Sequence, residues 1–319
     1  MNKKIFCTLG PATLNQKFLS YSQKNIDLLR INMSHINLKN LENTIRYIRK
    51  YTTTPICLDT EGAQIRTKIK KKIFLKKNKI LKINFKKGNS LFYPEYVNEK
   101  LKKNDVLELG FSGLEVKIVK KNSQDLALKV IKNGLLETNK GVHLKNRKIK
   151  MNYLTDKDMK AIKIAKIYKI KNFALSFTNS ASDIKKFNLL LKKERKIFKL
   201  ETKQALKEIK EIVKVGDNFL IDRGDLSKDI KIENIPIAQR KIIQKCKKAK
   251  KKVYVATNFL ESMINESSPT RGEVNDVYST LEQGANGLVL AAETAIGKYP
   301  IECVEVLKKL IKTFNKRLQ

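Results

Sequence analysis

Residues 196–226 read KIFKLETKQALKEIKEIVKVGDNFLIDRGDL, and this stretch decides the fold. Two apolar runs, 196–199 and 218–221, are predicted to form buried strands, and the segment 202–213 between them has helical periodicity. A strand, a helix and a second strand in this order give a parallel pair whose carboxyl ends lie at the same edge of a sheet. The carboxylates of Glu201 and Asp225 and the ammonium of Lys199 are therefore expected to lie close together.

This group of side chains is typical of a site for a metal ion and a phosphate. Carboxylate oxygens contributed one or two at a time, with room left for substrate oxygens, are ligands that Mg²⁺ prefers. A lysine beside them faces the charge of a transferring group. The alternative is a pair of surface salt bridges at two strand ends, which these residues alone do not exclude.

The alternation of strand and helix continues along the chain. It indicates a parallel sheet, and eight such units indicate a closed (β/α)8 TIM barrel. The expected strands cover residues 4–7, 27–31, 55–58, 172–176, 196–199, 218–221, 252–256 and 287–290. The expected helices cover residues 39–50, 156–168, 182–191, 202–213, 237–249, 272–283 and 301–314.

One interval breaks this rhythm. Between Arg66 and about Met151 the helical period gives way to apolar residues that alternate with lysine, as in 79–85 and 114–119. The alternation predicts a small antiparallel all-β domain inserted after the third strand. We therefore expect a TIM-barrel domain of residues 1–67 and 152–319 and an inserted β lid domain of residues 68–151. A lid over the carboxyl end of the barrel is the natural role, and a spacer is the alternative.

The composition is that of a globular protein. Hydrophobic residues make up 41% of the 319 residues, and no apolar run approaches the roughly 20 residues needed to cross a bilayer. Too few apolar residues precede Gly10 and Pro11 for a signal peptide, so we expect a cytoplasmic protein without a membrane partner. Four cysteines without paired spacing, with only His35 and His143, favour reduced, mostly buried thiols over a zinc site.

The formal net charge of +37 ordinarily indicates nucleic acid or an anionic surface as the partner. Here the lysines are spread over nearly every amphipathic segment, and the densest run is 247–252. This spread argues against a dedicated nucleic-acid face, which would show salt-sensitive binding to polynucleotide. A field of this sign would still draw anionic metabolites toward a cleft.

Polar residues follow seven of the eight expected strands. Because barrel enzymes build their active sites at the carboxyl ends of the strands, these residues are predicted to form one catalytic layer. Simple solvation of strand ends is the alternative. The residues are Arg30, Asn32, Asp59, Ser176, Lys199, Glu201, Asp225, Thr257 and Glu293.

Several short motifs also follow one another in a fixed order. They are CTLGPA (7–12), LRINMSH (29–35), LDTEGAQIRT (58–67), LTDKD (154–158), SF (176–177), RGDL (223–226), ATNFLESM (256–263), PTR (269–271) and ETAIGKYP (293–300). Together they resemble the pyruvate kinase family along nearly the whole chain apart from the insert. The resemblance implies a glycolytic enzyme that transfers phosphate from phosphoenolpyruvate to ADP, with pyruvate and ATP as products.

The resemblance also implies roles for single residues. Glu201 and Asp225 correspond to the ligands of a Mg²⁺ or Mn²⁺ ion that bridges the substrates. Lys199 corresponds to the cation that neutralises the phosphoryl group in flight. Arg30 corresponds to the residue that holds the phosphoryl oxygens, and Arg66 to a contact on the nucleotide side, both as positioning and electrostatic groups.

Other positions correspond to substrate contacts and to the proton that the product enolate receives. The backbone amides of Gly224 and Asp225, which open a turn or short helix, suit the substrate carboxylate. Ser176 belongs to the substrate-binding set. Thr257 corresponds to the residue beside the enolate carbon, and Glu293 to a member of the supporting proton-relay region.

Two further sets complete the resemblance. Lys140, in the run KGVH, corresponds to a lid lysine that reaches ATP or ADP on closure. The monovalent-cation ligands of the family correspond to Asn32, Ser34, Asp59 and Thr60. In the family, glutamate at position 64 accompanies K⁺ dependence and lysine accompanies independence. Gln64 therefore leaves the requirement for K⁺ open.

The sequence departs from the family pattern at several places. Glu61 and Ala63 stand where the family usually has Lys and Pro, and the usual acidic lid run is replaced by GFSG at 110–113. Asp222 replaces a small residue beside the metal motif. Ile36, Ser227, Ala291 and Ala292 are further replacements. None of these changes removes a metal ligand or Lys199.

The largest expected departure lies at the end of the sequence. One closing helix, 301–314, is followed by Gln319, so the usual carboxyl-terminal domain and activation by fructose bisphosphate are not expected. The altered lid and this ending leave a second hypothesis open, that of a non-catalytic phospho-metabolite-binding or regulatory protein. The sequence also leaves open whether the chain forms a homo-oligomer.

Overall fold

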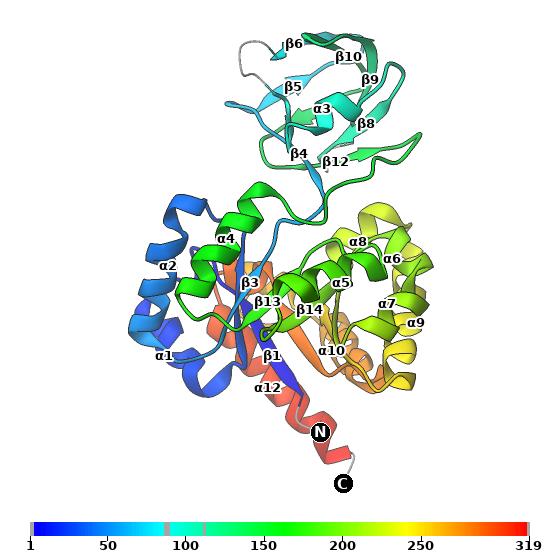
Figure 1. Ribbon diagram of the computed structural model, residues 1–319. Coiled ribbons are helices and arrows are strands. Elements are labelled where there is room, and N and C mark those ends of the chain that lie inside the picture. Colours follow the sequence, from blue (N-terminus) through cyan, green and yellow to red (C-terminus); the bar gives the residue numbers. More distant parts are fainter. Residues whose placement is uncertain (1–2, 86–89, 111–112, 318–319) are drawn as a thin grey trace. The chain divides into compact units, whose positions relative to one another are not determined.

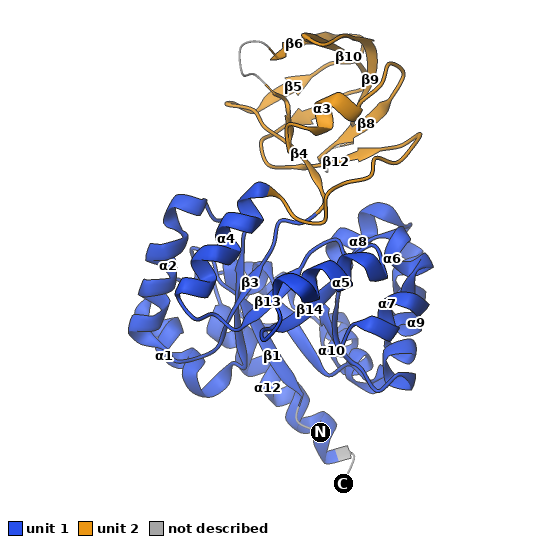
Figure 2. Ribbon diagram, in the orientation of Figure 1, with its two compact units in different colours: residues 1–62, 156–319 blue, residues 63–155 orange. Residues whose placement is uncertain are grey.

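The computed structural model describes residues 3–85, 90–110 and 113–317 (Figure 1). The chain divides into two compact units, residues 1–62 with 156–319 and residues 63–155 (Figure 2). The strand β4 (Ile65–Thr67) pairs with strands of the second unit, so the division falls before Ala63 rather than after Thr67. We call the first unit the barrel unit and the second the β unit.

The barrel unit is a closed barrel of eight parallel strands within the described residues, as the sequence predicts. The expected strands are confirmed to within one residue at each end. They are β1 (Lys4–Thr8), β2 (Leu28–Asn32), β3 (Ile56–Asp59), β13 (Asn172–Leu175), β14 (Arg195–Leu200), β15 (Asn218–Asp222), β16 (Lys252–Ala256) and β17 (Gly287–Leu290). In space β1 closes the barrel between β17 and β2.

Helices surround the strands (Figure 1). Side chains cap several of their first turns, for example Thr202, which accepts from the amide of Ala205. The helix expected over 202–213 is divided at Glu208, whose ψ of 4° leaves the helical range. A helix also forms at Gln16–Asn25, where none is predicted. The helices are α1 (Gln16–Asn25), α2 (Leu38–Tyr51), α4 (Asp156–Ile167), α5 (Ala181–Leu190), α6 (Lys203–Lys207), α7 (Ile209–Val215), α8 (Arg223–Asp229), α9 (Ile235–Lys248), α10 (Arg271–Gln283), α11 (Ala292–Ala295) and α12 (Pro300–Arg317), with short 3₁₀ turns at Ile232–Asn234 and Glu261–Ile264.

The strands of the barrel place a layer of buried polar side chains, here called the polar layer, above its apolar interior. Residues two apart on a strand face the same side, so each inward apolar residue is followed by a second inward residue nearer the carboxyl end. An apolar cluster inside the barrel includes Leu28, Cys57, Ala174, Ile197 and Leu220. Two residues further along stand, in the same order, Arg30, Asp59, Ser176, Lys199 and Asp222, all buried.

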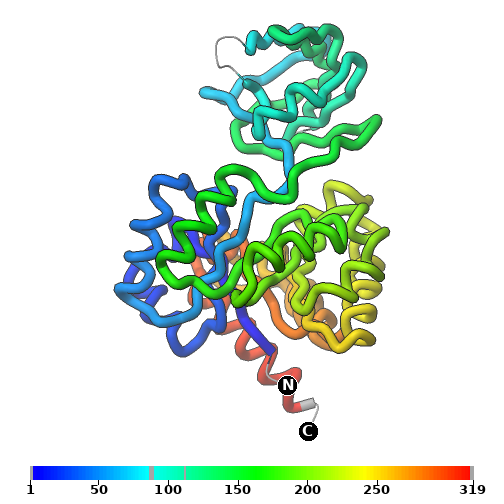
Figure 3. The backbone as a smooth tube through the Cα atoms, in the orientation of Figure 1, coloured from blue at the N-terminus to red at the C-terminus, as the bar shows by residue number. Residues whose placement is uncertain are grey.

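The β unit is an antiparallel structure with its own apolar core, which includes Phe92, Leu107, Val116 and Leu128. Figure 3 traces the chain from β3 through this unit and back to α4. Its main sheet has the order β6-β10-β9-β8-β12-β4-β7, and β5 pairs with β11. The strands are β5 (Ile73–Leu75), β6 (Ile80–Asn84), β7 (Phe92–Tyr93), β8 (Val106–Leu109), β9 (Leu114–Lys121), β10 (Asp125–Lys132), β11 (Gly134–Leu136) and β12 (Gly141–Leu144), with a short helix α3 (Val97–Lys100).

The composition led to expectations about membrane-spanning segments and about the cysteines. Across the described ranges, no helix combines the length and the apolar character needed to span a membrane. The cytoplasmic location stays a prediction. The four cysteines are free and buried, as expected. Burial raises the pKa of Cys246 to about 12, so this thiol stays protonated at neutral pH.

Candidate functional site

Lys199 is the centre of the polar layer. It is only 2% exposed. It faces the inside of the barrel, because Ile197, two residues earlier on β14, belongs to the apolar interior and residues two apart on a strand point to the same side. Its ammonium lies 2.8 Å from Oε1 of Glu201, 3.2 Å from Oδ2 of Asp59 and 3.6 Å from Oδ2 of Asp222. Carboxylates from three different strand ends therefore surround one buried cation.

Asp59 at the end of β3 links this cation to a second one. Its Oδ2 accepts from Nε of Arg30 at 2.6 Å and also pairs with the guanidinium Nη2 at 2.5 Å. Its Oδ1 accepts from the hydroxyl of Ser176 at 3.0 Å, and Arg30 donates a further bond to Thr8. A carboxylate shared by two buried cations satisfies most of its acceptor sites, which offsets the cost of burying it.

The electrostatics keep both cations charged. Burial alone would lower the pKa of Lys199, but Asp59 and Glu201 raise it overall. Burial likewise opposes the charge of Arg30, and Asp59 and Asp222 raise its pKa overall. Each cation therefore stays protonated across the physiological range, ready to face a negatively charged group.

Glu201 follows the last residue of β14 and is 1% exposed. Its Oε2 accepts from the amide of Phe177, a residue with a left-handed backbone conformation (φ 52°). Its Oε1 is buried, and among the described residues its one partner is the ammonium of Lys199, at 2.8 Å. Burial raises the pKa of Glu201, and the carboxylates of Asp225 and Asp222 raise it further. A cation would relieve this crowding.

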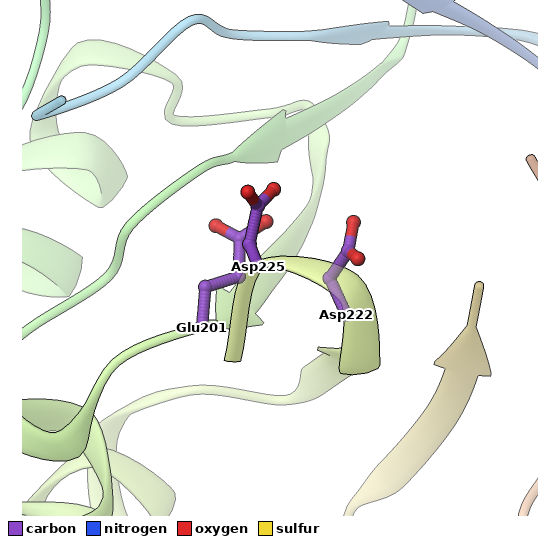
Figure 4. A group of neighbouring side chains, drawn as sticks. All are labelled: Glu201, Asp222 and Asp225. Atoms are coloured by element: carbon purple, nitrogen blue, oxygen red, sulfur yellow. The ribbon is translucent and has the colours of Figure 1, made fainter. Parts of the chain in front are cut away.

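Glu201, Asp222 and Asp225 form one carboxylate cluster (Figure 4). Each offers an oxygen, and the three oxygens lie within 4.8 Å of one another. Glu201 follows the end of β14, Asp222 is the last residue of β15, and Asp225 lies in the first turn of α8. Asp225 also pairs with Lys228 one turn further along α8. Hard oxygen ligands at this spacing suit a divalent cation.

Thr257 follows β16 in an uncommon conformation. Its φ is 80°, a costly value for a β-branched residue. Its hydroxyl donates to Oδ1 of Asp222 at 2.6 Å, and its carbonyl accepts from Arg223 at 2.6 and 3.0 Å. Arg223 is itself held by Asp276 and stacks on Phe259. These contacts fix the backbone that presents the hydroxyl.

Gly224 lies against this same loop. A Cβ added to it would stand 2.8 Å from the Thr257 methyl group, so any larger residue would move Thr257. The predicted role of the Gly224 and Asp225 amides in binding the substrate carboxylate stays a prediction.

Glu293, 1% exposed, is occupied by backbone amides. Its Oε1 accepts from Phe259 at 3.2 Å and from Leu260 at 3.3 Å, and its Oε2 accepts from Ala291 at 2.7 Å. In this arrangement Glu293 anchors the segment that follows Thr257. Its predicted membership of a proton relay stays a prediction.

The residues predicted to bind a monovalent cation lie at the ends of two paired strands. Asn32 on β2 stands opposite Asp59 on β3 in the register. Ser34 donates its amide to the side chain of Asn32, and the Thr60 hydroxyl accepts from the amide of Ser176. The structure brings the four residues Asn32, Ser34, Asp59 and Thr60 into one region. Their role as ligands is not tested by these contacts.

Beside this region lies an ion pair that the sequence does not reveal. Glu61 accepts from Lys157 at 2.7 Å, and Lys157 also donates to the carbonyl of Met33 at 2.5 Å. Glu61 is 5% exposed, so the pair is largely buried. The glutamate that replaces the usual lysine of the family thus has a specific partner.

Arg66 and Lys140 lie in the β unit, where they are near neighbours. Arg66 on β4 stands opposite Gly141 on β12, and Lys140 immediately precedes that strand. Arg66 reaches the carbonyl of Asn139, and Lys140 lies 3.7 Å from Glu137. Of the altered lid run at 110–113, residues 111–112 lie outside the described part of the chain.

One functional candidate was missed. Asp222 is buried in the cluster, yet the sequence singled it out only as a replacement. Burial opposes its charge, but Lys199 and Arg30 lower its pKa overall, so it is ionised at neutral pH. The signal that finds it is the period of two on β15, which places Asp222 on the same side as the inward Leu220.

Together these observations define a class of protein. A closed (β/α)8 barrel whose carboxyl-end layer joins two buried cations to a cluster of carboxylates is a barrel enzyme suited to phosphoryl chemistry. Comparison with known proteins identifies the family. The family model "Pyruvate kinase, barrel domain" matches residues 1–304.

Curated relatives agree with this match. The pyruvate kinase of Thermotoga maritima is 34% identical over 99% of this chain, and that of Methanocaldococcus jannaschii is 33% identical over 99%. The chain spans 72% and 70% of the length of these two proteins. It spans 56% of plastidial pyruvate kinase 3 of Arabidopsis thaliana, to which it is 30% identical. The chain belongs to the pyruvate kinase family, a family of transferase enzymes.

Proposed function

We propose that the chain transfers the phosphoryl group of phosphoenolpyruvate to ADP, giving pyruvate and ATP. The observation that carries this proposal is the buried ammonium of Lys199, surrounded by the carboxylates of Asp59, Glu201 and Asp222. Phosphoryl transfer needs positioned positive charge more than covalent chemistry. A cation that is preorganised in a buried site supplies this charge without reorganisation at the moment of reaction.

The residues present also fit a divalent cation. Oxygens of Glu201 and Asp225 belong to one carboxylate cluster within 4.8 Å, and in the described part of the chain the buried Oε1 of Glu201 has the ammonium of Lys199 as its only partner. We therefore assign Glu201 and Asp225 as the residues that would hold Mg²⁺ or Mn²⁺. When bound, this ion neutralises charge on the oxygens of the two substrates.

Arg30 and Lys199 are proposed to hold the phosphoryl group. Both are buried, and both are fixed by the same carboxylate of Asp59, so their separation does not depend on flexible surface side chains. Such fixed geometry lowers the entropic cost of aligning the phosphoryl group with the oxygen that attacks it. The hydroxyl of Ser176 donates to Asp59 and accepts from Lys199, and it thereby helps to fix the position of both side chains.

Thr257 is proposed to lie beside the carbon that receives a proton when enolpyruvate becomes pyruvate. Its hydroxyl hydrogen is held toward Oδ1 of Asp222. Its backbone is fixed by Arg223, and the following segment by Glu293. These contacts support a role in orientation around the reacting carbon.

The nucleotide and the monovalent ion are assigned to two further groups of residues. Arg66 and Lys140, neighbours in the β unit, are proposed to contact ADP or ATP. K⁺ is proposed to bind near Asn32, Ser34, Asp59 and Thr60, at the ends of β2 and β3.

A coupled assay tests the function. Pyruvate formed from phosphoenolpyruvate and ADP is reduced by lactate dehydrogenase, with Mg²⁺ or Mn²⁺ and with or without K⁺, and NADH oxidation is followed. The proposal predicts turnover that requires both substrates and the divalent ion. Binding of phosphoenolpyruvate without turnover under all of these conditions would instead support a non-catalytic phospho-metabolite-binding protein.

A further inference from the structure

Asp222 adds a charge to the site at a position where the pyruvate kinase pattern has a small residue. The strand β15 pairs in the same register as its neighbours, with Phe219 opposite Phe198 and Leu220 opposite Lys199. Asp222 therefore comes at the carboxyl end of the inward-facing row and not on the outer surface. It is 6% exposed. Burying a carboxylate costs free energy unless a cation or hydrogen-bond donors offset the cost.

The ion pairs in the described part of the site leave one carboxylate over. Asp59 is matched by Arg30, Glu201 by Lys199, and Asp225 by Lys228. Asp222 has Lys199 at 3.6 Å, but that ammonium is already closer to Asp59 and Glu201. The closest contact of the Asp222 carboxylate in the structure is the neutral hydroxyl of Thr257 at 2.6 Å. Among the described residues of the site, four carboxylates therefore face three cations, Arg30, Lys199 and Lys228, and a bound metal ion would be a partner for the fourth.

The geometry fits one ion. A divalent cation holds hard oxygens at about 2.0–2.6 Å, so two ligands on opposite sides of it stand roughly 4–5 Å apart. One oxygen each of Glu201, Asp222 and Asp225 lies within 4.8 Å of the other two, which is inside that limit. Among the described residues, the buried Oε1 of Glu201 accepts no hydrogen bond of good geometry and faces only the ammonium of Lys199 at 2.8 Å, which leaves a lone pair of this oxygen open to a cation. In Figure 4 the three side chains extend in the same general direction from the ends of β14 and β15 and from the first turn of α8.

We propose that Asp222 is a third carboxylate of the divalent-cation site and raises its affinity for the ion before any substrate binds. This inference rests on the proposed function, which assigns Glu201 and Asp225 to the same ion. The other two carboxylates are each paired with a lysine. Asp222 adds a third negatively charged oxygen ligand, so the free protein binds the ion more tightly than it would with a small residue at this position.

The experiment measures binding and not turnover. Purified protein without substrates is titrated with Mn²⁺, and free Mn²⁺ is followed by electron paramagnetic resonance. Asp222→Asn keeps the size of the side chain and an acceptor for Thr257 but removes the charge. We expect it to weaken Mn²⁺ binding by about 10- to 100-fold, the range typical when a residue that supports a metal site is changed. Asp222→Ala, which restores a small residue, should weaken binding at least as much.

Three control variants make the outcome decisive. Asp217→Asn removes the same charge at the residue just before β15, where the Asp217 side chain is 79% exposed and pairs with Lys251, and this variant should bind Mn²⁺ like wild type. Thr257→Val removes the hydroxyl while leaving Asp222 in place, and should also bind like wild type. Glu201→Gln removes an assigned ligand and should weaken binding. Circular dichroism confirms that each variant is folded.

The results separate the two claims. Unchanged binding in Asp222→Asn together with weakened binding in Glu201→Gln would overturn the role of Asp222 and leave the proposed metal site intact. Equal weakening in Thr257→Val and Asp222→Asn would also overturn it, because the effect would then act through the Thr257 loop. Unchanged binding in both Asp222→Asn and Glu201→Gln would overturn the inference and the assigned metal site together.

Discussion

The ammonium of Lys199 lies 3.2 Å from the carboxylate of Asp59, although 140 residues separate them in the sequence. The closed barrel brings them together, because each comes two residues after an interior apolar residue, Cys57 or Ile197, and therefore points into the barrel at the same level. Asp59 also takes two contacts from Arg30. One fully buried carboxylate therefore fixes the position of both cations proposed to act on the phosphoryl group.

Removal of this carboxylate should destabilise the protein strongly. Asp59→Asn leaves Arg30 and Lys199 buried without their shared counter-charge, and we expect a loss of about 3–5 kcal/mol in the free energy of unfolding. Urea denaturation measures this loss. Asp217→Asn, which removes an exposed carboxylate, is the matched control and should change stability little. A loss below about 1 kcal/mol in Asp59→Asn would mean that Asp59 is not the link between the cations.

Glu61 and Lys157 form a pair that should not tolerate the usual residue of the family. Glu61→Lys places a second ammonium against Lys157 in a largely buried position, with side-chain exposures of 7% and 22% for the original pair. We expect destabilisation by about 3 kcal/mol or more, measured by thermal or urea unfolding. The double variant Glu61→Lys with Lys157→Glu restores opposite charges and should recover part of the loss. If the single variant is as stable as wild type, the pair is not a structural element.

Glu293 should act as an anchor for the segment after Thr257. Glu293→Gln replaces one acceptor oxygen by a donor, so at least one of the amides of Phe259, Leu260 and Ala291 loses its partner. We expect a cost of about 1–3 kcal/mol and faster hydrogen exchange at those amides. Exchange measured by mass spectrometry reports this directly. Wild-type protection of residues 258–260 in the variant would show that Glu293 does not hold the segment.

Glu273 gives a stability that depends on pH. Burial raises its pKa, but hydrogen bonds from Ser262 and Thr270 lower it overall. Because the folded-state pKa lies below the unfolded value of about 4.3, the stabilisation is fully present above that value. It is lost as the pH falls through the lower folded-state pKa.

Glu273→Gln should therefore be less stable than wild type at neutral pH, by about 1 kcal/mol for the weakened capping box and its bonds. The difference between the two proteins should shrink as the pH falls from about 5 to 3. Urea denaturation at several pH values checks both expectations. A difference that does not change over this range would contradict the assignment of the lowered pKa.

Much of the barrel could be predicted from the sequence because its signals are local. The runs 196–199 and 218–221 are apolar and the segment between them is helical in period, and both strands form as expected. The layer of Arg30, Lys199 and Glu201 follows from strand ends in a parallel barrel. The prediction of one continuous helix over 202–213 was wrong. The structure has two helices separated at Glu208, and no Gly or Pro at that position indicates the break in the sequence.

The rest of the site depends on register and on partners far away in the sequence. Asp222 was treated as a departure from a motif, since the expected strand ended one residue earlier and its inward direction was not counted. The pairing of Glu61 with Lys157 joins residues 96 apart, so neither residue type nor spacing reveals it. Glu293 was predicted from its place after the eighth strand and from the resemblance, and only the three-dimensional structure shows that backbone amides occupy both of its oxygens.

The central claim is that Lys199 supplies positive charge to phosphoryl transfer, and one comparison of turnover tests it most directly. The coupled assay for pyruvate is run on wild type, on Lys199→Met and on Lys214→Met, a matched control whose side chain is 68% exposed. We predict metal-dependent turnover in wild type, unchanged turnover in Lys214→Met, and a fall in kcat of about 10²- to 10³-fold or more in folded Lys199→Met. Wild-type kcat in Lys199→Met, or no turnover by the wild-type protein with either Mg²⁺ or Mn²⁺, would contradict the account.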